Sequence, residues 1–74
     1  MNAEFEKKVG AKIRLYRENR NLTQEQLSAQ LQVRGCDITR SALAKIEVGQ
    51  RHIYIDEMRI LKELLCVSYE DLLE

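Results

Sequence analysis

Hydrophobic residues recur every three or four positions through most of the chain, which is the spacing of one face of an α-helix. The first stripe of this kind comprises Phe5, Val9, Ile13 and Tyr16. It predicts a helix from about Ala3 to Asn19, after which a short polar stretch interrupts the pattern. The alternation of polar and apolar residues that marks β-strands is hard to find anywhere in the sequence.

A second, shorter helix is marked by signals at both of its ends. Thr23, followed three residues later by Gln26, has the pattern of a capping box, in which the two side chains satisfy otherwise unpaired amides. The helix then extends over about residues 24–32. Gly35 stands just after its C-terminal end, where a positive φ is favoured. Its buried face comprises Leu27 and Leu31.

A third helix begins after Thr39, the candidate N-cap, although Asp37 is an alternative cap. Leu43 and Ile46 supply its apolar edge, and Gly49 is placed to end it. The outward positions are polar, basic or small and include no acidic side chain. They are Arg40, Ser41, Ala44 and Lys45.

The last part of the chain predicts two more helices, over about residues 55–65 and 69–73, with Ser68 capping the second. The apolar positions of the former cover well over half of its circumference, which is more than one packing surface needs. They are Ile55, Met58, Ile60, Leu61, Leu64 and Leu65. Part of this arc must therefore meet the first or last helix, or another chain. The pattern predicts a single all-α domain of five helices over residues 1–74.

Length and composition exclude several classes of protein. A chain of 74 residues has a small core and little room for an enclosed active site. Its apolar runs are too short for a membrane span, and the N-terminus lacks a signal-peptide core, so we expect a cytoplasmic protein without a membrane partner. Cys36, expected in an exposed loop, and Cys66 are too few for a disulfide framework. No metal set, cofactor site or catalytic set can be assembled around the single His52, so we expect no enzyme.

The charge balance is informative only when it is divided along the chain. The formal net charge is zero and the pI is about 6.6, which taken alone argues against a nucleic-acid-binding protein. Residues 1–55, however, contain ten Lys and Arg against six Asp and Glu, whereas residues 56–74 contain two against six. This asymmetry is compatible with one half that faces phosphates and another that faces solvent or a partner.

The second and third helices together indicate a helix-turn-helix motif over about residues 23–49. Two short capped helices are joined by a turn, and the second has a basic outer face. A helix of this kind fits the major groove of DNA and presents its side chains to base edges, while the N-terminus of the preceding helix is directed at a phosphate.

Several segments in order resemble the lambda-repressor-like, Cro-type helix-turn-helix domain, also called the XRE family. These are Leu22 to Leu27, Leu31 to Val33, Thr39 to Arg51 and Cys66 to Leu73. The resemblance covers about residues 9–73 and implies a compact five-helix domain that binds double-stranded DNA.

The resemblance also implies roles for individual residues. The base-contacting positions of the third helix correspond to Arg40, Ser41, Ala44 and Lys45. The phosphate-contacting positions correspond to Thr23, Gln24, Thr39, Gln50 and Arg51. A structural ion pair of the family, which ties the first helix to the third, corresponds to Arg17 and Glu47.

Three features depart from the family pattern. The segment between Val33 and Thr39 is about five residues longer than the usual turn, and we expect Ile38 to anchor it in the core. Gln32 and Cys66 both stand where the family usually has glycine. If Cys66 keeps a positive φ, the cost is roughly 1 kcal/mol. Because the turn fixes the angle between the two helices, its length bears on the docking geometry on DNA.

We therefore expect a sequence-specific DNA-binding transcriptional regulator that represses by promoter occlusion rather than activates. The alternative is a protein-interaction module of the same fold that has lost DNA binding, which the neutral net charge and the long turn favour. Because one small domain makes few phosphate contacts, we expect a homodimer on a palindromic operator. We expect the dimer interface, or seam, at Ile60, Leu64 and the last helical turn.

Overall fold

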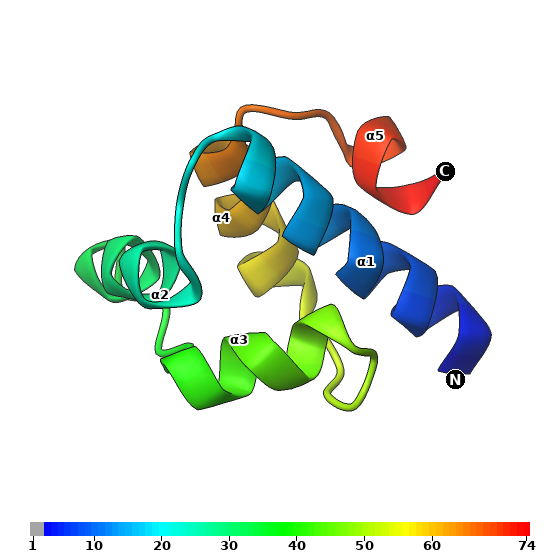
Figure 1. Cartoon of the computed structure of the whole chain (residues 1–74), viewed down its shortest axis with the longest axis horizontal. Coiled ribbons are helices and arrows are strands. Elements are labelled where there is room, and N and C mark those ends of the chain that lie inside the picture. Colours follow the sequence, from blue (N-terminus) through cyan, green and yellow to red (C-terminus); the bar gives the residue numbers. More distant parts are fainter. Residues whose placement is uncertain (1–2) are drawn as a thin grey trace.

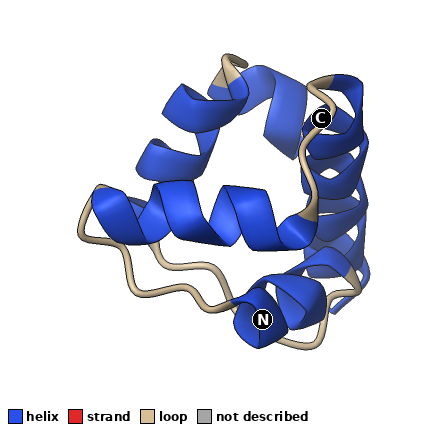
Figure 2. Ribbon diagram, turned by 60° about the vertical axis from the view of Figure 1, so that its left-hand side comes forward, coloured by secondary structure: helices blue, strands red, loops and turns tan. Residues whose placement is uncertain are grey.

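The computed structural model describes residues 3–74, so the first two residues of the predicted 1–74 domain lie outside it. The described chain forms five helices and no strand, and the ribbon views show how these helices are arranged (Figures 1 and 2). They are α1 (Ala3–Asn19), α2 (Gln24–Val33), α3 (Arg40–Glu47), α4 (Ile55–Leu65) and α5 (Tyr69–Leu73). The predicted all-α class and order of helices are confirmed, and the fold measures 29 × 21 × 20 Å.

The helix starts follow the predicted caps. Thr23 Oγ1 accepts from the amide of Gln26 at 3.0 Å, and the Gln26 side chain accepts in return from the amide of Thr23 at 2.9 Å. Thr39 caps α3 by accepting from the Ala42 amide at 3.1 Å, so the alternative cap, Asp37, is not used. Ser68 caps α5 in the same way.

The first four helices end in one common motif. Each is followed by a residue with positive φ, and these residues are Asn21, Gly35, Gly49 and Cys66. In each case the next residue donates its amide back to a carbonyl five positions earlier, as Cys36 does to Leu31 at 2.9 Å. This is the Schellman arrangement, which satisfies carbonyls that a helix end leaves unpaired. The expectation that Cys66 keeps the left-handed conformation is confirmed, with φ 58.

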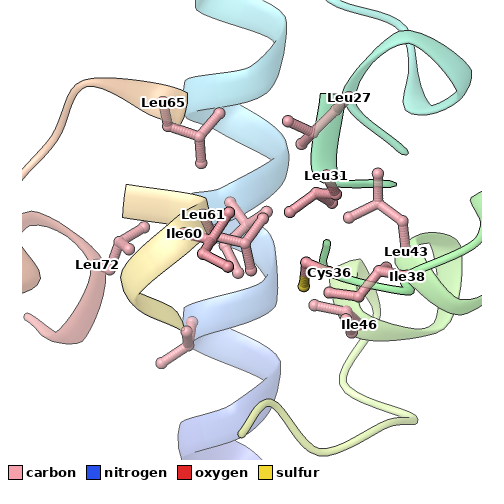
Figure 3. Close-up of a cluster of buried hydrophobic side chains, with 12 residues drawn as sticks. Leu27, Leu31, Cys36, Ile38, Leu43, Ile46, Ile60, Leu61, Leu65 and Leu72 are labelled. Carbon is pink, nitrogen blue, oxygen red and sulfur yellow. The ribbon is translucent and has the colours of Figure 1, made fainter. Parts of the chain in front are cut away.

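The core gathers side chains from all five helices (Figure 3). It comprises Val9, Ile13, Leu27, Leu31, Cys36, Ile38, Leu43, Ile46, Ile60, Leu61, Leu65 and Leu72. The wide apolar arc of α4 is explained within the chain, because α1 and α2 both pack against it and Leu72 of α5 joins the same cluster. Ile60 is therefore buried, and its predicted place in a dimer seam is wrong, whereas Leu64 stays half-exposed. Phe5, at the start of the predicted stripe, is 46% exposed.

The lengthened turn between α2 and α3 is folded into the core rather than extended into solvent. Ile38 is fully buried, as expected, and Ser28 Oγ donates to its carbonyl at 2.8 Å. Cys36 is also buried, so its predicted place in an exposed loop is wrong. Its thiol lies against Leu31 and its neighbours because the Schellman motif turns this residue inward, and burial raises the pKa of that thiol.

The backbones of α1 and α3 approach each other closely at Gly10. A Cβ atom on this residue would lie 2.1 Å from the carbonyl oxygen of Ile46, well inside contact distance. Gly10 is buried in the middle of α1, where a glycine otherwise weakens a helix. The close approach is thus the reason that glycine is needed here.

Replacing Gly10 with alanine should destabilise the fold by about 1–3 kcal/mol, because the new methyl group overpacks the α1–α3 contact. In an unobstructed helix the same change stabilises by about 1 kcal/mol, so the sign of the effect is diagnostic. Urea unfolding followed by circular dichroism measures it. Gly35→Ala is the control, with open space around its Cβ but a positive φ, and should cost about 1 kcal/mol. A more stable Gly10→Ala protein would contradict the close approach.

Candidate nucleic-acid interface

The outer face of α3 is a continuous exposed surface. Leu43, Ile46 and Glu47 point into the molecule and are buried. At about 100° per residue, the opposite side of the helix carries two rows of side chains. The first row is Arg40 and Ala44, and the second is Ser41 and Lys45. All are exposed except the half-buried Ala44, and α3 lies along one edge of the molecule (Figure 1).

The two cations of this face are not neutralised by the protein. Within residues 3–74, no hydrogen bond or ion pair holds the guanidinium of Arg40 or the ammonium of Lys45. The other arginines engage carboxylates, with the exception of Arg20. Charge is therefore left available on the face that the sequence assigns to base contacts.

A buried ion pair holds α3 to α1. Arg17 Nε donates to Glu47 Oε2 at 2.7 Å, and Arg17 Nη2 donates to Glu47 Oε1 at 3.0 Å. The exposed fractions of the two side chains are only 8% and 1%. The hydrogen bonds to Glu47 raise the pKa of Arg17 above its usual value against the cost of burial. Both residues were predicted from the sequence, and the structure brings them together.

The same two residues organise the start of α2. Arg17 Nη1 donates to the carbonyl of Leu22 at 2.7 Å, and Gln24 Nε2 donates to Glu47 Oε1 at 3.0 Å. The side chain of Gln24, expected to touch DNA phosphate, is therefore engaged inside the protein. The capping box uses the amides of Thr23 and Gln26 and leaves those of Gln24 and Glu25, which have no intrahelical acceptor. Backbone donors thus remain at the N-terminus of α2.

An open hollow of about 830 Å³ lies beside this junction. It is lined by Arg14, Arg17, Glu18, Asn21, Leu22, Thr23, Gln24, Glu25 and Arg40. Thr23, Gln24 and Arg40 were predicted to touch DNA, and here they share one concave surface. Arg14 was not predicted to lie at this site; it is exposed on α1, where it faces Glu18 at 3.5 Å. A hollow with three arginines, of which Arg17 is paired with Glu47, and a helix N-terminus favours anions, although Glu18 and Glu25 also line it.

The remaining predicted phosphate-contacting residues flank α3. Thr39 lies at its start as the cap, and Gln50 is exposed in the loop beyond its end. Arg51 has a different role, because its guanidinium donates to both oxygens of Glu57 at 2.9 and 3.0 Å. These bonds lower the pKa of Glu57, whose carboxylate also accepts from the Tyr54 amide at 3.1 Å. Arg51 therefore fastens the loop after α3 to the start of α4.

Over residues 3–74, no cluster of three or more histidine, cysteine or acidic side chains is arranged to hold a metal ion. No helix in this range is long and apolar enough to cross a membrane.

Comparison with known proteins gives one match. A family model described as a helix-turn-helix domain matches residues 10–74, which is nearly the whole chain. No curated protein and no solved structure shows significant similarity.

Breaking the buried ion pair from one side should be far more costly than removing it whole. Arg17→Met leaves Glu47 buried with only Gln24 as a donor, so we expect a loss of about 3–5 kcal/mol in unfolding free energy. The double variant Arg17→Met/Glu47→Leu should lose clearly less than the sum of the two single changes. Urea unfolding of the four proteins gives the coupling. If Arg17→Met is too unstable to fold, a double variant that does fold shows the same coupling between the two residues. Additive effects of the two changes would contradict the prediction.

Proposed function

The chain belongs to the helix-turn-helix domain family, and from that premise we propose that it is a sequence-specific regulator of transcription that binds double-stranded DNA. In this proposal α3 enters the major groove. An α-helix with its side chains is about 10–12 Å across, and the groove is about 12 Å wide. Helix-turn-helix domains in general indicate DNA-binding regulators, whereas sequence specificity and the direction of regulation are part of our proposal.

The observation that carries the proposal is that α3 has an exposed basic face and is held in place by buried contacts on its inner face. Arg40 and Lys45 lie on the outer face of α3, and within the described chain no carboxylate neutralises them. Glu47, on the inner face of the same helix, is held by Arg17 and Gln24. A face that reads bases must keep its side chains in a fixed register on the duplex, and this support supplies that register.

Each residue of the face has a chemical part in the proposal. Arg40 is suited to a two-pronged contact with guanine, worth about 1–3 kcal/mol against the wrong base. Lys45 contacts a base or a phosphate, and Ser41 donates or accepts with little selectivity alone. Ala44 leaves room for the base edges or touches a thymine methyl group.

Phosphate contacts come from both sides of α3. We assign them to Thr23 and the backbone amide of Gln24 on one side. On the other side we assign them to Thr39, Gln50 and Arg51. Arg14 extends the first group, because it lines the same hollow as Thr23 and Arg40. For Arg51, the contact must be made while its guanidinium stays shared with Glu57.

We further propose repression by occupation of a promoter, with two copies of the chain on a palindromic operator. A single domain of this size offers few phosphate contacts, and two half-sites on one face of DNA double them. The exposed edge of α4 at Leu64, together with α5, is the proposed seam; Ile60 is excluded from it by burial.

Replacing both cations of the face should abolish sequence preference without affecting the fold. For Arg40→Ala/Lys45→Ala we expect unchanged helicity and a loss of at least tenfold in preference for a selected duplex over a random one. The matched control, Lys8→Ala/Arg59→Ala, removes the same charge from exposed positions of α1 and α4 and should keep the preference. Fluorescence anisotropy at several salt concentrations measures both. Weak salt dependence, or no binding to any duplex, would instead support the protein-interaction module.

The assembly has its own test. Sedimentation equilibrium of the 8.7 kDa chain should show association toward twice that mass at high concentration, and two chains per palindromic duplex. Leu64→Lys should weaken this association, because it places a charge on the proposed seam. A protein that stays monomeric at every concentration and binds one copy per duplex would contradict the homodimer.

A further inference from the structure

Val48 is an exposed apolar residue at the C-terminal end of the reading helix. It follows Glu47 directly, and its φ of −106° and ψ of 6° keep its side chain close to the path of the helix. Half of the side chain, 50%, is exposed to solvent. The base-contacting positions that the family resemblance implies do not include this residue.

The position of Val48 on the helix places it on the same face as the predicted base-contacting residues. It lies four residues after Ala44 and eight after Arg40, so the three form one row along the outer side of α3. At a rise of 1.5 Å per residue, the row spans about 12 Å between Arg40 and Val48. That length corresponds to between three and four base-pair steps of about 3.4 Å each. Lys45 and Ser41 form the adjacent row.

The loop after Val48 is fixed against α1, so the residue has a defined position. A Cβ atom on Gly49 would lie 2.8 Å from the Cα of Lys7, which shows how closely this loop packs on the first helix. The ring of His52 lies with Nδ1 2.5 Å from the Glu6 carboxylate, at a second point of contact. On the other side, Arg51 joins the loop to α4 through Glu57.

An apolar side chain at this place has a specific use in a DNA groove. In the major groove the only apolar group on a base edge is the C5-methyl of thymine. We propose that Val48, with Ala44 beside it, is a specificity-determining residue that contacts thymine methyl groups at the end of each half-site read by α3. This inference rests on the proposed function, because it assumes that the outer face of α3 enters the groove.

The immediate surroundings favour this use over a protein contact. The residues that share the outer face with Val48 are Arg40, Ser41 and Lys45, which are polar or charged, with only Ala44 adding apolar surface. Large exposed apolar residues that are candidates for protein contacts, such as Val33 and Ile55, lie on other elements. Val48 is thus an apolar residue at the end of a polar and basic helix face.

The test uses a duplex chosen by the wild-type protein from a random pool. Each thymine of one half-site is replaced in turn by deoxyuridine, which removes the methyl group and leaves the hydrogen-bonding edge unchanged. Burial of one such carbon is worth about 0.8 kcal/mol, so we expect about fourfold weaker binding at one or two thymines. Fluorescence anisotropy at fixed salt concentration measures each ratio of dissociation constants.

Variants then assign the effect to the residue. In Val48→Ala the uracil penalty should fall to near onefold at the thymine that Val48 contacts, while helicity and the penalties at other thymines stay unchanged. Val33→Ala makes the same truncation at a valine that is 88% exposed on α2, and it should keep every penalty of the wild type. The inference is overturned if no thymine is sensitive, or if Val48→Ala leaves all penalties as they were. If the random pool yields no bound duplex, the proposed function itself fails.

Discussion

A carboxylate placed in the core of a small helical domain must be fully paired, and Glu47 meets this condition through three donors. Two come from the guanidinium of Arg17 and one from the amide of Gln24. Because Arg17 also reaches the carbonyl of Leu22, one buried cluster joins α1, the turn that follows it, the start of α2 and the end of α3. Rearranging these elements would leave a buried charge without a partner, which costs several kcal/mol. The orientation of the exposed face of α3 depends on this cluster.

The small size of the chain constrains the rest of the fold. A chain of 74 residues has little apolar surface to bury, and the helices α2 to α5, with five to 11 residues, are too short to be stable alone. Backbone groups at the helix ends are therefore satisfied one by one, with side-chain caps at the starts of α2, α3 and α5 and the Schellman arrangement after α1 to α4. The lengthened turn follows the same rule, since Ser28 pairs with the carbonyl of the buried Ile38.

Neutral net charge and DNA binding are compatible in this molecule because the charges are used differently in different places. Three of the seven arginines form ion pairs between different elements of the fold: Arg17 with Glu47, Arg51 with Glu57, and Arg34 with Glu63. The acids of α4 and α5 also serve helix starts, as Glu57 and Asp71 do. What remains unpaired on the outer face of α3 is positive. The relevant quantity is thus the local charge of one helix face, which the total conceals.

The helices and the caps of α2, α3 and α5 could be predicted from the sequence alone, because they depend on local signals, whereas the buried pair was implied by the resemblance to the family. The bounds of α1, α4 and α5 and the capping roles of Thr23 and Thr39 could all be predicted in this way. Which apolar residues stay exposed depends on the packing of the helices against one another. Ile60 and Cys36 are covered by segments distant in the chain, whereas Phe5 and Val48 are left partly exposed. Periodicity marks one face of a helix as apolar, but burial depends on which other elements pack there, and short-range patterns carry no information about that.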